Sequence, residues 1–393
     1  MRDYFLVTVF FLMLAGTASA NSQSDRWESA RATFEPLIPE DTAIGIVVGV
    51  LNNGENEVYA FGNGKYDANT IFEIGSVTKV FTALTLAAMV TDGQLALSNP
   101  IQNYLPEGIS SPTKDSNDIR LVHLATHTSG LPRMPPNFLR LSLIWQLDNP
   151  YKGYTIDMLW DGVAKTTLTS TPGQRYEYSN FGAGLLGQLL AGAGKTGYES
   201  LIKDRICGPL GMTNTMVTLS ADAKSALAGG HLKTGRKTAN WDCASLVAAG
   251  GLKSNVRDLM ILLNEYIRPT NKKLAKAIEL TVVKRHATFG EDGIGLAWHI
   301  NKTEDREILW HNGGTGGYAS FVGMVRSERI GLVVLSNADF FNKITASGFE
   351  YLHQLQKARS KDKMKKNEQE HGTKEDVERK TKRQQRPAES RED

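Results

Sequence analysis

The stretch FEIGSVTKVFTAL, residues 72–84, joins a small polar turn to an apolar segment with the character of a buried helix. Ser76 and Lys79 are three residues apart, so on a helix they share one face, one turn from each other. A serine hydroxyl is a weak nucleophile until a base lies beside it, and an uncharged lysine can be that base. The stretch therefore predicts an activated serine at the start of a buried helix.

The spacing between serine and lysine is not specific by itself. Average composition predicts roughly one or two such pairs in a chain of this length. The same Ser-x-x-Lys spacing occurs at three other places, Ser111/Lys114, Ser200/Lys203 and Ser360/Lys363. Only Ser76 combines a glycine-serine turn, a buried helix and partner motifs further along the chain.

The second motif is Tyr178-Ser179-Asn180, which contains the chain's only Tyr-x-Asn. It follows the turn residues Thr171–Gly173 and precedes an apolar helix that starts at Phe181, which places it on a loop at a helix N-terminus. A phenol normally titrates near 10. Beside an ammonium group it should lose its proton more easily and shuttle protons. The alternative is a tyrosine that only packs at a helix start.

The third motif is WHNGGTGG, residues 310–317, which joins two strand-like runs. A glycine-rich strand edge lets a substrate backbone approach closely and can present a backbone N–H to a developing oxyanion. A phosphate loop is excluded here because it needs Gly-Lys-Ser/Thr at the opening of a helix. The remaining alternative is an ordinary glycine-rich hairpin.

Together the three motifs resemble those of the penicillin-recognising serine hydrolases, in the branch of the class C β-lactamases. That branch also includes D,D-carboxypeptidases, D-aminopeptidases and esterases. The resemblance runs from about Ile44 to Leu355 and implies an α/β (α+β) fold, in which helices flank an antiparallel sheet and a mainly helical region is inserted at about 95–249. Further similar segments are HTSGLP at 127–132, PLGM at 209–212, AAGGL at 248–252 and RDL at 257–259.

The resemblance also implies roles for the residues of the first two motifs. Ser76 would attack a carbonyl carbon and become acylated, and Lys79 would take the serine proton or tune the site electrostatically. Tyr178 would pass a proton to the leaving group and later help to activate water. Asn180 would hydrogen-bond the substrate amide or Lys79.

The third motif departs from the family pattern. Where typical β-lactamases have Lys-Thr-Gly, this chain has His311-Asn312-Gly313. The cation that engages a substrate carboxylate is replaced by an imidazole that is mostly neutral at pH 7, as in some D,D-peptidases and esterases of the branch. His311, Asn312 and Gly313 are still expected to line the substrate site, and the N–H groups of Ser76 and Gly314 to form the oxyanion hole.

Strand-like runs lie at both ends of the body. Residues 43–51 and 57–61 predict a hairpin, and 294–300, 306–310, 318–325 and 331–335 predict an antiparallel meander. Helices are expected between them and at the end of the body, at 24–37, 77–90, 121–126, 139–147, 156–163, 181–190, 198–206, 255–267 and 344–355. The body is therefore expected to form one hydrolase domain, residues 21–356.

The two ends of the chain differ from this body. Residues 1–20 have a short apolar run and end in Ala18-Ser19-Ala20, which predicts a cleaved signal peptide and an exported, periplasmic or secreted protein. Residues 357–393 carry thirteen Lys/Arg and nine Asp/Glu. This charged tail is predicted to be disordered with transient helix at most, and the alternative is weak contact with an anionic surface. Without it the net charge is about −1, which argues against nucleic-acid binding.

No other group of residues in the sequence indicates a cofactor. His123 and His127 are four residues apart, but no glutamate follows His123 as in a zinc-binding helix, so no metal is expected. Cys207 and Cys243 could pair in an oxidising compartment or remain buried thiols, and sequence leaves both possibilities open. A Gly-x-Ser-x-Gly elbow does not occur in the chain.

Three functions remain open from the sequence. The first is a serine hydrolase that acts on β-lactams or D-Ala-D-Ala peptides through an acyl-enzyme. The second keeps this chemistry but acts on esters or D-amino-acid amides. The third is a non-catalytic protein that binds a cell-wall ligand. The expected partner is a small-molecule or peptide substrate, with no nucleic acid and no membrane span after signal cleavage.

Overall fold

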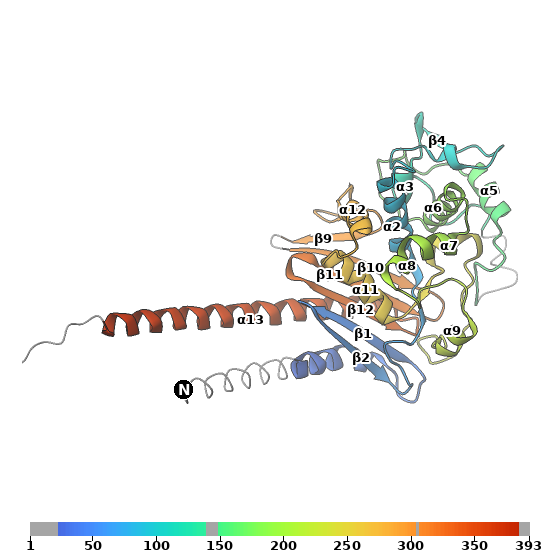
Figure 1. The fold of residues 1–393 in the computed structure, drawn as a ribbon. Coiled ribbons are helices and arrows are strands. Elements are labelled where there is room, and N and C mark those ends of the chain that lie inside the picture. Colours follow the sequence, from blue (N-terminus) through green and yellow to red (C-terminus); the bar gives the residue numbers. More distant parts are fainter. Residues whose placement is uncertain (1–22, 139–147, 304–305, 385–393) are drawn as a thin grey trace, which may run out of the picture. The chain divides into compact units, whose positions relative to one another are not determined.

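The computed structural model describes residues 23–138, 148–303 and 306–384, and Figure 1 shows how their elements are arranged. The chain divides into two units, one up to Leu352 and one from His353 onward. The predicted signal peptide at 1–20 and the predicted helix at 139–147 lie outside the described residues.

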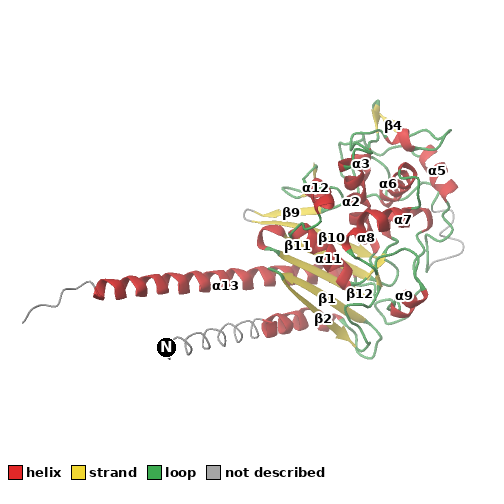
Figure 2. Cartoon of the chain, viewed as in Figure 1, coloured by secondary structure: helices red, strands yellow, loops and turns green. Residues whose placement is uncertain are grey.

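The body is built on one eight-stranded antiparallel sheet with the strand order β2-β1-β12-β11-β10-β9-β8-β7. Figure 2 shows its strands in yellow, with red helices around them. The strands are β1 (Gly45–Asn52), β2 (Glu55–Gly62), β7 (His286–Ala287), β8 (Gly293–Ile294), β9 (His299–Thr303), β10 (Arg306–Gly314), β11 (Ala319–Val325) and β12 (Ile330–Ser336). The predicted antiparallel sheet is confirmed.

The sheet is assembled from both ends of the body. β1 pairs with β12 from Ile46↔Ser336 to Asn52↔Ile330. All residues of β1 except the last are buried, which is the pattern of a strand covered on both faces. The strands that follow the helical region therefore close against the first strand of the body.

Helices cover both faces of the sheet. A Cβ on Gly49 of β1 would lie 2.6 Å from the Met260 sulfur, so this face of β1 packs on α11 (Val256–Ile267). On the other face, the rings of Phe321 in β11 and Phe349 in α13 (Phe341–Gln384) have centroids 5.2 Å apart. Because side chains alternate along a strand, the two helices use different residues of the same sheet.

The helical part of the body is organised around α2 (Thr78–Thr91), which packs on α6, α7, α10 and α12. Twelve of the fourteen residues of α2 are buried, as expected of a helix surrounded by protein. The other helices are α3 (Leu121–Ala125), α5 (Ile156–Ala164), α6 (Asn180–Ala193), α7 (Tyr198–Ile202), α8 (Gly208–Leu210), α9 (Ala221–Ala226), α10 (Val247–Gly250) and α12 (Lys272–Val282). Two short strand pairs, β3 (Phe72–Glu73) with β6 (Lys253–Ser254) and β4 (Thr113–Lys114) with β5 (Asn117–Asp118), complete this region.

One predicted strand is divided in the structure. The run 294–300 contributes to two strands, β8 and β9, which are joined by a tight turn. The Gly295 N–H donates to the Trp298 carbonyl at 2.9 Å, and Ala297 has a φ of 63°. The apolar run therefore indicates burial correctly, but its composition does not indicate the turn, in which one residue has a left-handed backbone conformation. The helix α12 was also not predicted.

The described part of the tail is helical. Residues 357–384 continue α13 as helix, whereas sequence analysis expected a terminal helix at 344–355 and disorder from residue 357. The tail is rich in Lys, Glu, Gln and Arg, which are good helix formers. Low apolar content predicts that a segment has no core of its own, but it does not exclude a helix. Residues 385–393 lie outside the described part.

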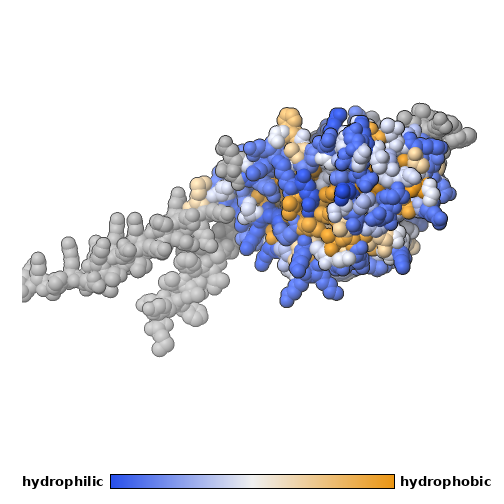
Figure 3. All heavy atoms as spheres, turned by 90° about the horizontal axis from the view of Figure 1, so that it is seen from above, coloured by the Kyte–Doolittle hydropathy of each residue, from blue (hydrophilic) through white to orange (hydrophobic). Residues whose placement is uncertain are grey.

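The face drawn in Figure 3 is mainly hydrophilic where its residues are coloured, with hydrophobic side chains gathered near its middle. Across the described residues, the structure contains no helix with the length and apolar character needed to cross a bilayer.

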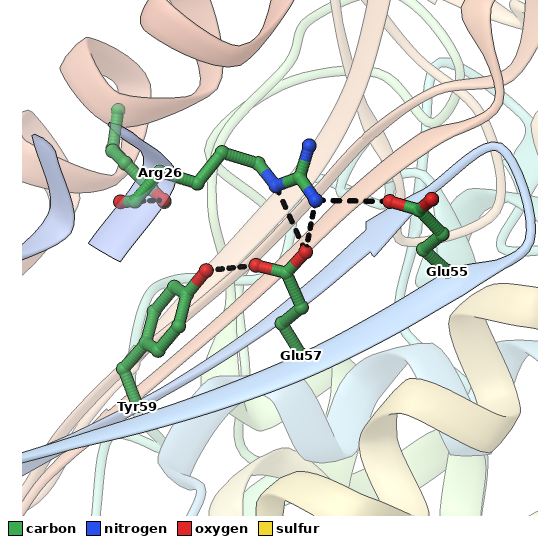
Figure 4. A network of polar contacts seen from close by, with 5 residues as sticks. Arg26, Glu55, Glu57 and Tyr59 are labelled. Atoms are coloured by element: carbon green, nitrogen blue, oxygen red, sulfur yellow. Dashed lines mark hydrogen bonds and ion pairs between the residues drawn. The ribbon is translucent and has the colours of Figure 1, made fainter. Parts of the chain in front are cut away.

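A buried ion pair attaches the N-terminal helix, residues 23–34, to the edge strand β2. The Arg26 Nε donates to Glu57 at 2.8 Å, and an Arg26 Nη reaches Glu55 at 2.9 Å (Figure 4). Tyr59 donates to the second oxygen of Glu57. The Arg26 and Glu57 side chains are 10% and 6% exposed. Each buried charge is therefore compensated by the opposite charge of its partner.

We therefore expect Arg26→Ala to lower the free energy of unfolding by about 3–5 kcal/mol, because it leaves a buried carboxylate without its partner. Arg31→Ala is the matched control, since Arg31 pairs with Glu35 in full contact with solvent, where screening leaves an ion pair little effect on stability. Urea unfolding measures both variants. Equal losses in the two variants would contradict this account.

Candidate active site

Ser76 lies in a single 3-10 turn, Gly75–Val77, that leads directly into α2. Its N–H belongs to the first turn, where backbone donors have no partner within the helix. Gly75 has a φ of +48°, and a Cβ there would lie 2.6 Å from the Gly314 nitrogen. Glycine is therefore required for both backbone conformation and space, and the contact brings the end of β10 beside the serine.

Lys79 lies one turn further along and is 2% exposed. Its Nζ lies 3.0 Å from the Ser76 Oγ, 2.9 Å from the Asn180 Oδ1 and 2.6 Å from the Ala249 carbonyl. Burial, and then the charge of Arg133, hold the pKa of Lys79 well below its usual value. A neutral amine fits these partners, since its two N–H groups satisfy the two carbonyl oxygens and its lone pair can accept the serine proton.

Tyr178 completes the cluster around Ser76. The Lys79 Nζ lies 4.8 Å from the centroid of the Tyr178 ring. Burial raises the pKa of Tyr178 above its usual range. The expectation that an adjacent ammonium would lower the pKa of this phenol is contradicted by the direction of the shift, because burial disfavours the phenolate. The raised pKa favours a phenol that keeps its proton in the free site.

Hydrogen bonds of Ser179 hold the loop that carries Tyr178 in place. Ser179 caps α6 by accepting the Gly182 N–H at 2.8 Å, and its hydroxyl donates to the Pro132 carbonyl at 2.7 Å. The Ser179 N–H donates to the His127 Nδ1 at 3.2 Å, and the His127 ring packs against that of Tyr178 with centroids 4.3 Å apart. The HTSGLP segment thus supports the tyrosine.

The third motif is an extension of β10, and its residues alternate in direction. Gly313 faces the serine turn, because a Cβ there would lie 2.9 Å from the Ser76 nitrogen. Asn312 points the other way, and its Nδ2 donates to Thr345 Oγ1 at 2.9 Å. The structure therefore does not bring the Asn312 side chain to Ser76. The period of two in a strand explains why neighbours in one motif face opposite sides.

His311 is fully buried. Its Nδ1 lies 2.7 Å from the Asn312 carbonyl, which assigns the proton to Nδ1 and leaves Nε2 as an acceptor. Among the described residues, that Nε2 has no hydrogen-bond partner. Burial, and then the neighbouring His299 and Lys79, hold the pKa of His311 well below its usual value. The imidazole therefore supplies no positive charge.

A pocket opens onto this cluster, and part of its wall was not predicted. Tyr151, Trp241 and Cys243 line it beside Ser76, Asn180 and Gly314, together with Leu246, Ala249 and Gly250. The buried carboxylate of Glu73 fixes the Trp241 loop by accepting the Trp241 N–H at 2.8 Å. No spacing or motif in the sequence indicates Tyr151 or Cys243 as residues of this wall. Cys207 and Cys243 are both buried free thiols.

In the described part of the chain, no group of three or more His, Cys, Asp or Glu side chains is arranged to hold a metal ion. The His123 Nδ1 accepts the Arg120 N–H at 3.2 Å, and His127 supports Ser179 as described above. Both histidines considered as ligands thus hydrogen-bond the backbone.

The family model of beta-lactamases matches residues 30–357. The chain belongs to the beta-lactamase family. Its relatives in this family include the D-alanyl-D-alanine-carboxypeptidase/endopeptidase AmpH of Escherichia coli K12, which is 27% identical over 315 residues, 75% of this chain and 79% of AmpH. A beta-lactamase of Pseudomonas fluorescens is 28% identical over 353 residues, 79% of this chain and 93% of the relative.

Solved structures of the beta-lactamase family have the same fold. A class C beta-lactamase from Rhodobacter sphaeroides superposes with a TM-score of 0.71 at 25% identity, covering 83% of this chain and 98% of that one. A beta-lactamase/D-alanine carboxypeptidase from Yersinia pestis, complexed with citrate, gives 0.70 at 25% identity, covering 84% and 95%. The resemblance inferred from the three motifs and the predicted fold class are confirmed, and membership of a hydrolase family is established.

The buried histidines of the site predict acid sensitivity. His127 and His311 have a pKa well below 6.5, chiefly because of burial, and burial lowers that of His299 to about 4. Below pH 6.5 the unfolded chain binds protons that the folded chain does not, so stability should fall as the pH drops toward 4. Each histidine contributes a slope of about 1.4 kcal/mol per pH unit.

Urea unfolding between pH 7.5 and 5 measures this slope. His311→Gln should flatten it by the share of one histidine, whereas His353→Gln, which removes an exposed imidazole, should leave it unchanged. An unchanged slope in His311→Gln would show that the buried imidazole does not determine the acid sensitivity.

Proposed function

We propose that this chain is an exported serine hydrolase that acylates Ser76 and acts on D-Ala-D-Ala-type peptides or β-lactams. The observation that carries the proposal is the 3.0 Å contact between the Ser76 Oγ and the buried Lys79 Nζ. A nucleophile within hydrogen-bond reach of a base of depressed pKa is the arrangement required for covalent catalysis. The relatives named above as carboxypeptidase and beta-lactamases support the choice of an amide substrate.

The first step is acylation. Lys79 takes the proton of the Ser76 hydroxyl as the serine oxygen bonds to the carbonyl carbon, and the backbone N–H groups of Ser76 and Gly314 stabilise the resulting oxyanion. The carbon–nitrogen bond then breaks, and the leaving nitrogen takes the proton that Tyr178 holds. Lys79 returns its proton to Tyr178, so no net charge remains on the two groups.

The second step is hydrolysis of the acyl-enzyme. A water molecule attacks the ester carbon and gives a proton to the neutral Lys79 amine, beside the Tyr178 phenol, and this proton then passes to the leaving Ser76 oxygen. Collapse of this intermediate restores the Ser76 hydroxyl and releases the acid. Asn180 keeps the Lys79 amine oriented throughout, because its Oδ1 accepts from Nζ at 2.9 Å.

A second candidate function uses the same steps on an ester or a D-amino-acid amide. The neutral, buried His311 favours it, since that position provides no cation for a substrate carboxylate. A non-catalytic ligand-binding protein is less favoured because the serine, lysine and tyrosine are all present and close together. Export rests on the signal-peptide pattern of residues 1–20, and secretion into the periplasm or medium is part of the proposal.

A fluorophosphonate probe should label the protein once, on Ser76, as measured by intact and peptide mass spectrometry. Ser76→Ala should abolish labelling. Ser111→Ala is the matched control, since it removes the serine of another Ser-x-x-Lys pair. Lys79→Ala should slow labelling by roughly 10²- to 10⁴-fold, because the general base is lost. Undiminished labelling in Ser76→Ala would refute the assignment.

The substrate class is tested by kcat/KM for an N-acyl-D-Ala-D-Ala peptide, nitrocefin and p-nitrophenyl butyrate. We expect the peptide or the β-lactam to be turned over by the parent and not by Ser76→Ala. Turnover of the ester alone would reject D-Ala-D-Ala peptides and β-lactams as substrates in favour of the second candidate function. Turnover of none of the three, with no labelling of Ser76, would favour the non-catalytic protein.

A further inference from the structure

The pocket beside Ser76 has no charged side chain among its lining residues. Lys79 is buried beneath it, and His311 is neutral. Under the proposed function, however, the substrate carries a free carboxylate next to the bond that is broken. Transfer of a carboxylate out of water is costly unless a cation or several donors receive it. The site therefore needs a positive charge from outside the three motifs.

Arg133 is the side chain whose charge reaches this site. Its guanidinium carbon lies 5.2 Å from the centroid of the Tyr178 ring, and the Lys79 Nζ lies 4.8 Å from the same centroid. The guanidinium and the amine thus lie over one ring, separated by no more than the sum of these distances. Unlike Lys79, Arg133 is exposed to solvent.

The guanidinium is available for a ligand. No carboxylate within the described ranges forms an ion pair with Arg133, whereas Arg26, Arg205 and Arg326 each pair with an acidic side chain. Arginine keeps its charge and presents a planar set of donors that matches a carboxylate in two parallel hydrogen bonds. An exposed, unpaired arginine over a site tyrosine is suited to capture an anionic group.

The backbone of Arg133 is held firmly although its side chain is exposed. The Arg133 carbonyl accepts the N–H groups of Asn180 at 3.0 Å and Phe181 at 3.2 Å, at the start of α6. The preceding carbonyl, of Pro132, accepts the Ser179 hydroxyl at 2.7 Å. Arg133 is therefore attached to the same triplet that carries Tyr178, and the position of its Cα relative to Ser76 is fixed by the fold.

We propose that Arg133 binds the free carboxylate of the substrate and so makes the enzyme selective for acids over the corresponding amides or neutral esters. Arg133 supplies the positive charge that the neutral His311 does not. In this proposal Arg133 is a substrate-binding residue. The proposal rests on the proposed hydrolase function and adds a substrate selectivity to it.

A purely structural role predicts a different outcome. If Arg133 only packed on Tyr178, its removal would weaken all substrates alike, whatever their charge. If it only tuned Lys79 through its charge, its removal would change the pH dependence of acylation and leave ground-state binding unaltered. A pair of ligands that differ only in the carboxylate separates these roles from the proposed one.

The test measures binding by calorimetry in the Ser76→Ala protein, with N-acetyl-D-Ala-D-Ala and its C-terminal carboxamide as ligands. Adding Arg133→Ala should weaken the acid by about 10- to 100-fold, the effect of losing a charged hydrogen bond, and change the amide less than about 2-fold. Arg133→Lys should restore part of the loss. Arg268→Ala, which removes an exposed arginine at the end of α11, should change neither ligand.

Equal weakening of acid and amide would overturn the proposal, and so would an unchanged or undetectable affinity for the acid. Fluorophosphonate labelling of Ser76 in the parent protein is measured in parallel, since the neutral probe carries no carboxylate for the arginine to bind. Labelling that persists while acid selectivity is absent would reject Arg133 alone. Loss of labelling at Ser76 in the parent protein would instead reject the proposed hydrolase function.

Discussion

The burial of one amine holds the candidate site together. Lys79 is bound by the serine of the turn that precedes its helix, by Asn180 at the start of α6 and by the Ala249 carbonyl in α10. These partners come from segments up to 170 residues apart in sequence, so the contacts form only when the helical region is folded. Burial both satisfies the amine with oxygen atoms and disfavours its charge. The geometry and the basicity of the site therefore have the same cause.

A second constraint is the close approach of the serine turn to the edge of β10. A side chain at Gly75 or Gly313 would collide with backbone atoms of the other segment. The Ser320 hydroxyl in β11 also donates to the Ile74 carbonyl at 2.8 Å. The helical region and the sheet thus meet at the serine, and the sheet itself depends on β1 closing against β12. Both ends of the body are needed to place one backbone N–H group.

The sequence predicted the parts of this arrangement that are local. Ser76 and Lys79 follow from a turn and a helical spacing, and the sheet follows from β-rich runs at both ends of the body. Asn312 was expected at the site because it stands in a motif, although strand alternation turns it toward Thr345. Arg133 and Tyr151 were missed because tertiary packing brings them to the site from loops without a spacing rule. The direction of the pKa shift of Tyr178 was wrong because it depends on burial, which a motif does not reveal.

The central claim is that Lys79 is neutral in the free protein and serves as the base for Ser76. The pH dependence of the second-order rate of fluorophosphonate labelling tests it most directly. The rate should rise with pH and reach a plateau at an apparent pKa well below the 10.5 of a free lysine, and this transition should be absent in Lys79→Ala. A rate that rises only near pH 10.5, or one with the same pH profile in Lys79→Ala, would contradict the account.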